Sequence, residues 1–179
     1  MSGQTITIKG KEGDLTGYLA SPGPGMGPGV VVIQEIFGVN AVMREIADGM
    51  ASRGYFALVP DLFWRLEPNI QLTDKTDADW KKALDLMGRF DVDKGIVDIQ
   101  SSIDTLRALP GCTGKVGALG YCLGGQLAYL TAARTNIDAA VGYYGVNIQN
   151  RLDEAKNIQH PFMPPIAAAH QSVPPPPPA

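Results

Sequence analysis

The sequence predicts a single α/β domain whose sheet is mostly parallel, with helices on both faces. Continuous apolar runs typical of buried parallel strands occur at 29–33, 55–60 and 139–144. Stretches with helical periodicity occur at 40–53, 77–90 and 93–109. Strands that alternate with helices indicate a parallel sheet. A chain of 179 residues with 45% hydrophobic content can bury one good core, so we expect one domain over 1–179.

The amino-terminal part predicts a β-hairpin and then a loop. Two short β-prone runs at 5–9 and 15–19 are separated by a turn-forming segment. The Gly- and Pro-rich loop at 21–29 precedes a strand, whereas a phosphate-binding loop must follow one. We therefore give the nucleotide-binding interpretation little weight.

The stretch 117–125, Gly-Ala-Leu-Gly-Tyr-Cys-Leu-Gly-Gly, predicts a sharp turn between a short strand at 115–116 and a helix at 126–134. Small residues on both sides of Cys122 let strand and helix approach closely, as in a nucleophile elbow with sulfur in place of oxygen. A thiol at a helix N-terminus is favoured as thiolate. The simpler alternative is that Cys122 is a small buried hydrophobe.

The charge, hydrophobicity and cysteine content of the sequence limit the kinds of molecule that the protein is expected to bind. The net charge of −3, with scattered Lys and Arg, gives no basic surface for nucleic acid, so we expect a small-molecule partner. The sequence shows neither a secretory signal nor an apolar run long enough for a membrane. Two cysteines form neither a disulfide framework nor a metal-ligand spacing. We expect a cytoplasmic, monomeric protein with reduced thiols and without a metal or cofactor.

Functional residues of a parallel sheet gather at the carboxyl ends of its strands. Glu35, Asp61, Cys122 and Tyr144 all fall there. The backbone N–H of Leu123 and that of Ile36 are the expected oxyanion donors, and Glu35 is a candidate partner for Cys122. Glu35 could also be an ordinary strand-end carboxylate bonded to local backbone.

Other residues that attract attention have simpler explanations. Packing alone accounts for the aromatic residues Tyr143, Tyr144, Trp64 and Trp80. Cys112 does not have glycines both two residues before and two residues after it, as Cys122 has. Of the two histidines, we expect His160 to be structural, because it precedes a proline at the apparent start of a strand at 160–163, on the opposite edge of the sheet from the elbow. His170 lies past that strand, but within a Pro-rich tail at 164–179 that cannot pair in a sheet. We expect the chain to be incomplete, or its tail to be aberrant.

Several motifs together carry a family resemblance. They are Gln-Glu-Ile-Phe-Gly-Val-Asn at 34–40, Met-Arg-Glu at 43–45, Gly-Tyr at 54–55, Pro-Asp-Leu at 60–62, Gly-Lys-Val-Gly at 114–117, Gly-Tyr-Cys-Leu-Gly-Gly at 120–125 and Ala-Val-Gly-Tyr-Tyr-Gly-Val at 140–146. In these the sequence resembles the dienelactone hydrolases (carboxymethylenebutenolidases), a branch of the α/β-hydrolase fold. The resemblance extends to about residue 163.

The resemblance implies a Cys–His–Asp triad that opens a lactone or similar ester in the degradation of aromatic compounds. Cys122 matches the nucleophile, and Glu35 matches the glutamate that helps to generate the thiolate when substrate enters. Ile36 and Leu123 match the oxyanion-hole amides, and Phe37 and Tyr143 match pocket residues.

The sequence departs from the family pattern in two places. His170 stands where the family has its triad Asp, and the segment with the family's catalytic His is absent. Around 77–88, where the prototype places an Arg, a Tyr and a Trp at the substrate carboxylate, Lys81 or Lys82 would be the replacing cation.

We therefore expect a lactone or ester hydrolase with a cysteine nucleophile. Two alternatives stay open. A cysteine-dependent amidotransferase also uses a Gly-x-Cys-x-Gly elbow, and a catalytically defective scaffold would keep the elbow without turnover. Because a triad base is missing, we expect poor turnover from these 179 residues.

Overall fold

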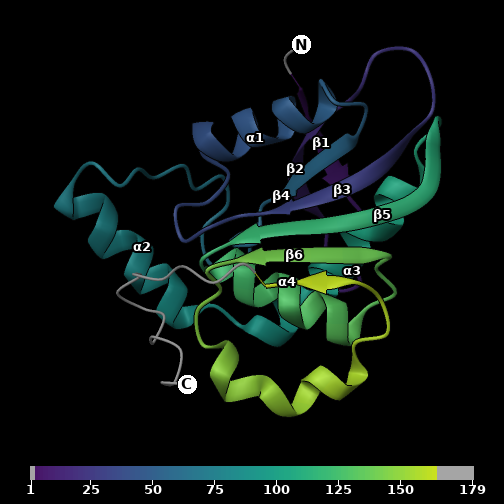
Figure 1. The fold of residues 1–179 in the computed structure, drawn as a ribbon. Coiled ribbons are helices and arrows are strands. Elements are labelled where there is room, and N and C mark those ends of the chain that lie inside the picture. Colours follow the sequence, from purple (N-terminus) through teal and green to yellow (C-terminus); the bar gives the residue numbers. More distant parts are fainter. Residues whose placement is uncertain (1–2, 165–179) are drawn as a thin grey trace.

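The computed structural model describes residues 3–164, which form a seven-stranded sheet with the order β1-β2-β4-β3-β5-β6-β7 (Figure 1). The strands are β1 (Gln4–Ile8), β2 (Leu15–Ala20), β3 (Gly27–Ile33), β4 (Phe56–Pro60), β5 (Cys112–Tyr121), β6 (Ala139–Tyr143) and β7 (Phe162–Met163). The helices are α1 (Ala41–Ala51), α2 (Asp77–Arg89), α3 (Val92–Ala108) and α4 (Leu123–Arg134), with a 3-10 segment η1 (Ile148–Asn157).

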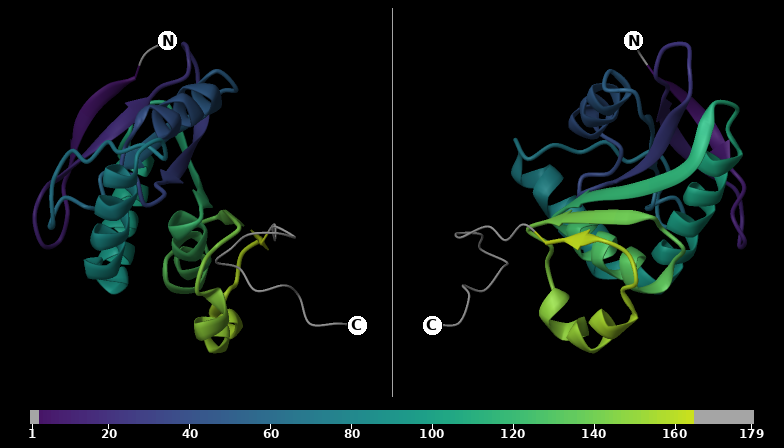
Figure 2. Two further views of the ribbon diagram at one scale, coloured as in Figure 1. Left: turned by 90° about the vertical axis from the view of Figure 1, so that its left-hand side faces the viewer. Right: turned by 45° about the vertical axis from the view of Figure 1, so that its right-hand side comes forward.

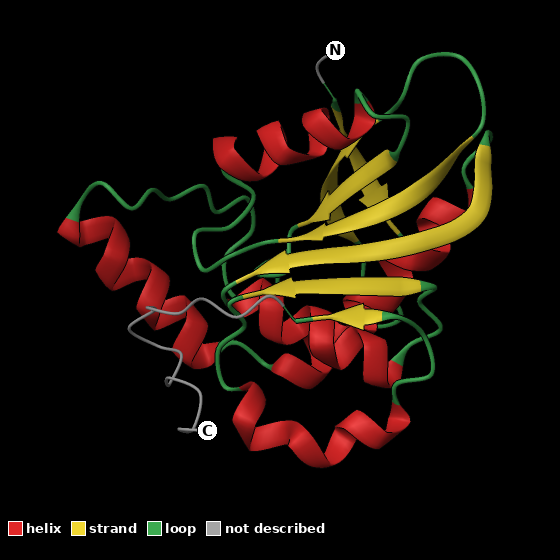
Figure 3. Ribbon diagram, in the orientation of Figure 1, coloured by secondary structure: helices red, strands yellow, loops and turns green. Residues whose placement is uncertain are grey.

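The five strands β4, β3, β5, β6 and β7, in this order in the sheet, run parallel. The expected hairpin of β1 and β2 extends the sheet, because β2 pairs antiparallel with β4. The predicted α/β architecture is therefore confirmed. The arrows of β3, β5 and β6 in Figure 3 point toward the same edge of the sheet, beyond which α2 lies. This carboxyl edge is where the sequence placed the candidate functional residues.

The two faces of the sheet are covered unequally. On one face, α3 and α4 pack on the larger apolar cluster, which includes Ile99, Ile103, Leu127 and Leu130. On the other face, α1 packs on a smaller cluster built from β3 and β4. The segment η1, which the sequence did not predict, packs against α4 (Figure 2).

The helices α1, α2 and α3 each begin directly after a capping residue. The side chains of Asn40, Thr76 and Asp91 each accept a hydrogen bond from a backbone N–H three residues on, at the starts of α1, α2 and α3. These caps satisfy backbone donors that the helix itself cannot pair.

The strand before the cysteine was predicted too short. It begins at Cys112 and continues through Gly117 and Gly120 as far as Tyr121, so the bend is confined to Cys122, and α4 begins at once at Leu123. Glycine is unfavourable inside strands, which is why a Gly-rich segment indicated a turn. Here β5 pairs with β3 and β6 on both sides, and this pairing overrides the local preference.

None of the helices in residues 3–164 combines the length and apolarity needed to cross a bilayer. Over the same residues, no group of three or more His, Cys, Asp or Glu side chains is placed to hold a metal ion.

Candidate active site

Cys122 lies at the bend between β5 and α4 in a conformation that non-glycine residues rarely adopt, with φ of 54° and ψ of −113°. Backbone hydrogen bonds hold it there. Its N–H donates to the carbonyl of Tyr143 at 3.1 Å, and its carbonyl accepts from the N–H groups of Gly125, Gln126 and Val146. A strained backbone that the surroundings fix in this way is common at functional sites.

The glycines around Cys122 are required by close packing. A Cβ atom on Gly120 would lie 1.9 Å from the carbonyl oxygen of Gly124, which is impossible without moving strand or helix. A Cβ atom on Gly124 would lie 2.4 Å from the carbonyl oxygen of Ile33. The first turn of α4 therefore rests directly on the end of β3, and this brings the thiol to the segment that carries Glu35.

Glu35 is close enough to Cys122 for its charge to act on the thiol. Burial raises the pKa of Cys122 above 9.0, a hydrogen bond from the backbone N–H of Leu123 opposes this, and the Glu35 carboxylate raises it further. The phenol of Tyr144 donates a long hydrogen bond, 3.5 Å, to Oε1 of Glu35. Burial and then Glu35 raise the pKa of Tyr144 to about 12, so this phenol stays protonated.

The N–H of Leu123, at the start of α4, lowers the pKa of Cys122, which is the direction expected for a thiol at a helix N-terminus. Burial acts more strongly in the opposite direction, and the Glu35 carboxylate adds a smaller effect to it, so the pKa of Cys122 is raised overall. Cys122 rests as a neutral thiol, and a proton must leave it before it can attack a carbonyl.

The two amides expected at an oxyanion hole belong to neighbouring, firmly held segments. Ile36 and Leu123 are both buried, at the end of β3 and the start of α4. The loop after β3 is fixed by buried Gln34, whose Oε1 accepts from the N–H of Leu62 at 3.0 Å. The amides therefore lie on rigid elements, as preorganised donors must.

A cavity of about 280 Å³ opens beside Glu35. The loop after β3, the first turn of α1 and the segment before α2 line it through Glu35, Phe37, Asn40, Ala41, Val42, Thr73, Asp74 and Lys75. Phe37 makes an edge-on contact with Trp80 of α2, with ring centroids 5.1 Å apart. Cys122 is not among the residues that line this cavity.

The segment of residues 73–75 is a part of the site that the sequence analysis missed. Asp79 accepts hydrogen bonds from the N–H and the hydroxyl of Thr73, and the indole of Trp80 donates to the carbonyl of Asp74. Asn40 donates to the carbonyl of Leu72, which ties the segment to α1. The contacts with Asp79 and Trp80 are local, six residues apart, whereas the contact between Asn40 and Leu72 joins residues 32 apart and could not be read from a local pattern.

Neither of the two lysines that the sequence suggested as a cation for the substrate lines this cavity. Lys81 is exposed on α2 and is not among the residues lining this cavity, and Lys82 forms an ion pair with Glu67.

Tyr143 and Asp61 have structural roles as well as positions at the carboxyl edge. The ring of Tyr143 stacks on Tyr121 with centroids 5.1 Å apart. Asp61 is buried, and its carboxylate accepts from the N–H groups of Phe63 and Asn69. Asp61 therefore shapes the loop after β4.

The remaining predicted residues are not brought to the thiol. Cys112 packs against the larger apolar cluster at the start of β5, as a structural thiol would. His160 is exposed before β7, at the edge opposite the elbow, as expected. His170 lies outside the described residues.

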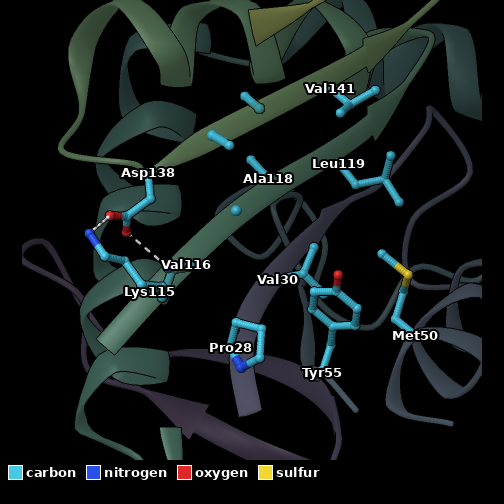
Figure 4. Close-up of a pocket in the computed structure, with 14 residues that line it drawn as sticks. Pro28, Val30, Met50, Tyr55, Lys115, Val116, Ala118, Leu119, Asp138 and Val141 are labelled. Atoms are coloured by element: carbon cyan, nitrogen blue, oxygen red, sulfur yellow. Dashed lines mark hydrogen bonds and ion pairs between the residues drawn. The ribbon is translucent and has the colours of Figure 1, made fainter. Parts of the chain in front are cut away.

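A second cavity, of about 300 Å³, lies on the α1 face of the sheet (Figure 4). Met50 and Tyr55 form one side, the apolar side chains of β3, β5 and β6 form the floor, and the Asp138–Lys115 pair closes one end. It contains neither Cys122 nor Glu35, so the candidate active site is at the carboxyl edge.

A mostly parallel sheet with helices on both faces and a strained residue, Cys122, at the sharp bend between β5 and α4 define the α/β-hydrolase fold. The chain matches the Dienelactone hydrolase family over residues 15–176 and belongs to that family.

Named relatives agree with this assignment. The carboxymethylenebutenolidase of Pseudomonas putida is 40% identical over 159 residues, which cover 88% of this chain and 67% of that protein. A provisionally named carboxymethylenebutenolidase of Azospirillum brasilense is 44% identical over 169 residues, 92% of this chain and 71% of that protein. The crystal structure of a dienelactone hydrolase-like promiscuous phosphotriesterase from metagenomic libraries superposes with a TM-score of 0.76 at 25% identity, covering 97% of this chain and 72% of that one.

Proposed function

We propose that this protein hydrolyses a dienelactone or a similar lactone or ester through Cys122, with an acyl-thioester intermediate, in the degradation of aromatic compounds. The observation that carries the proposal is the strained, half-buried thiol between the end of β3 and the start of α4. The relatives named carboxymethylenebutenolidase support the substrate class.

In the first step, Glu35 accepts the proton of the Cys122 thiol as a carbonyl compound enters. The electrostatic coupling between the two groups supports this pairing. The thiolate then attacks the carbonyl carbon, and the backbone N–H groups of Ile36 and Leu123 stabilise the resulting oxyanion. Tyr144, which remains protonated, holds Glu35 through its long hydrogen bond.

In the second step, the oxyanion collapses and the carbon–oxygen bond of the leaving group breaks. The departing oxygen takes up a proton, which Glu35 holds, and a thioester to Cys122 remains. Water must then attack the thioester, and this attack needs a general base. Within residues 3–164 the one histidine is His160, at the wrong edge of the sheet. We expect deacylation to be the slower of the two steps.

A cysteine-dependent amidotransferase would release ammonia from glutamine. Membership of the Dienelactone hydrolase family favours lactone hydrolysis over this reaction. The alternative of a catalytically defective scaffold predicts that an ester does not acylate Cys122.

Assays of dienelactone and p-nitrophenyl ester hydrolysis test the proposal, with Cys122→Ser and Cys112→Ser as matched variants. We expect the first substitution to abolish product release and the second to leave it intact. Equal activity of the wild type and Cys122→Ser would overturn the proposal.

A further inference from the structure

Gln34 is a fully buried polar residue that directly follows β3, and its side chain bonds to two backbone groups. Its Oε1 accepts from the N–H of Leu62 at 3.0 Å, and its Nε2 donates to the carbonyl of Glu35 at 3.3 Å. The first bond fixes the orientation of the side-chain amide, because the N–H of Leu62 must face an oxygen, and Nε2 then faces the carbonyl. Gln34 therefore ties the segment after β4 to the loop after β3.

The carbonyl that Nε2 holds belongs to the same peptide unit as the N–H of Ile36. A peptide unit is planar and trans, so its carbonyl and its N–H point in opposite directions. The bond from Gln34 to the carbonyl of Glu35 therefore fixes the direction of the Ile36 N–H, which is one of the two expected oxyanion donors. A hydrogen bond to a carbonyl also polarises the amide, which makes the N–H at its other end a stronger donor.

The backbone of Gln34 contacts the helix that carries the other expected donor. A Cβ atom on Gly124 would lie 2.7 Å from the carbonyl oxygen of Gln34, so the first turn of α4 rests on this residue as well as on Ile33. Leu123, whose N–H is that donor, directly precedes Gly124 and begins α4. Gln34 thus contacts the segment of one amide through its backbone and orients the other amide through its side chain.

We propose that Gln34 is a positioning residue for the oxyanion hole, and that it sets the orientation of the Ile36 amide relative to that of Leu123. This inference rests on the proposed function. Without Nε2, the peptide unit between Glu35 and Ile36 can rotate, which turns the N–H away from the oxyanion and the carbonyl oxygen toward it. The simpler alternative is that Gln34 satisfies two buried backbone groups and affects the stability of the fold alone.

Two reactions of Cys122 separate the orientation of the amide from the stability of the fold. Acylation by p-nitrophenyl acetate, measured as the burst of p-nitrophenol, passes through an oxyanion. Alkylation by iodoacetamide displaces iodide at a saturated carbon and does not. Gln34→Met, which keeps the length of the side chain and removes its amide, should slow acylation by up to about 10²–10³-fold, the usual cost of one lost oxyanion donor. Alkylation should be unchanged.

Asp138→Asn is the matched control for a weakened contact between a side chain and the backbone. The carboxylate of Asp138 also accepts from a backbone N–H, that of Val116 at 2.9 Å. Asp138 directly precedes β6, at the edge of the sheet opposite the thiol. Asp138→Asn should lower the free energy of unfolding, which urea unfolding measures, and leave both reaction rates unchanged.

Gln34→Glu keeps the oxygen that accepts from Leu62, so it remains informative if Gln34→Met does not fold. Burial raises the pKa of the new carboxyl group. When protonated, this group can donate to the carbonyl of Glu35, and when ionised it repels that carbonyl. The ratio of the acylation rate to the alkylation rate, compared with the same ratio in the wild type, should therefore rise as the pH falls.

Wild-type acylation by a folded Gln34→Met variant, or equal slowing of acylation and alkylation in both Gln34 variants, would overturn the inference and leave the proposed function standing. Absence of any Cys122-dependent burst from the wild type would instead refute the proposed function, and this inference with it.

Discussion

Gly124 and the carbonyl of Ile33 approach so closely that a Cβ atom on the glycine would lie 2.4 Å from that oxygen. This contact seats the first turn of α4 on the end of β3. Because Glu35 follows two residues after Ile33, the same contact places the thiol beside the carboxylate.

Substitution of Gly124 should therefore damage both the fold and the site. We expect Gly124→Ala to lower the free energy of unfolding by about 2 kcal/mol or more, because the neighbouring backbone cannot give way. Gly88→Ala is the matched control, since Gly88 lies in α2 with open space around it, and alanine should stabilise that helix by about 1 kcal/mol. Urea unfolding of both variants measures the difference, and equal effects would contradict the packing described.

The strain at Cys122 predicts an unusual stability order. At φ of 54° and ψ of −113°, glycine should be more stable than alanine by about 1–2 kcal/mol, because it lacks the Cβ atom that makes this region unfavourable. At Cys112, which lies in the strand β5, the alanine variant should instead be more stable than the glycine variant. Thermal unfolding of the four variants tests this. If the Cys122→Ala and Cys122→Gly variants had equal free energies of unfolding, the backbone at the bend would carry no strain.

Removal of the Glu35 charge should change thiol reactivity and catalysis in opposite directions. Burial and then Glu35 raise the pKa of Cys122, so Glu35→Gln lowers this pKa and speeds alkylation by iodoacetamide near pH 8. Acylation by an ester should fall by about 10²–10⁴, the usual contribution of a general base. Parallel alkylation and burst measurements check this, and a fall in both rates would show that Glu35 does not repel the thiolate.

The ionisation of Asp138 should make the free energy of unfolding depend on pH in the acid range. Burial alone would raise its pKa, but Lys115, the N–H of Val116 and Arg107 outweigh this and lower it from 3.8 to about 2. The folded pKa lies below the unfolded one, so the stabilisation is complete above about pH 4 and is lost as the pH falls toward 2.

Asp138→Asn should consequently cost on the order of 1–2 kcal/mol at neutral pH and little near pH 2. Asp85→Asn is the control, because Asp85 is 56% exposed and pairs only with Arg89 on the same helix. Urea unfolding across this pH range measures both. A cost for Asp138→Asn that stays constant with pH would refute the assignment.

The helices and parallel strands were predictable because their apolar patterns and caps are local signals. The elbow was also visible, through the glycines on either side of Cys122. The resting state of the thiol was not, because burial and the charge of Glu35 depend on how β3 meets α4. The position of Lys75 likewise depends on hydrogen bonds that Thr73 and Asp74 make with α2.

The central claim is that the sulfur of Cys122 becomes acylated. Intact-protein and peptide mass spectrometry after brief exposure to p-nitrophenyl acetate tests it most directly. The account predicts one acetyl group per chain, located on Cys122, that forms together with a stoichiometric burst of p-nitrophenol and hydrolyses slowly. A burst without any acetyl group on Cys122, or the same burst from Cys122→Ser, would contradict it.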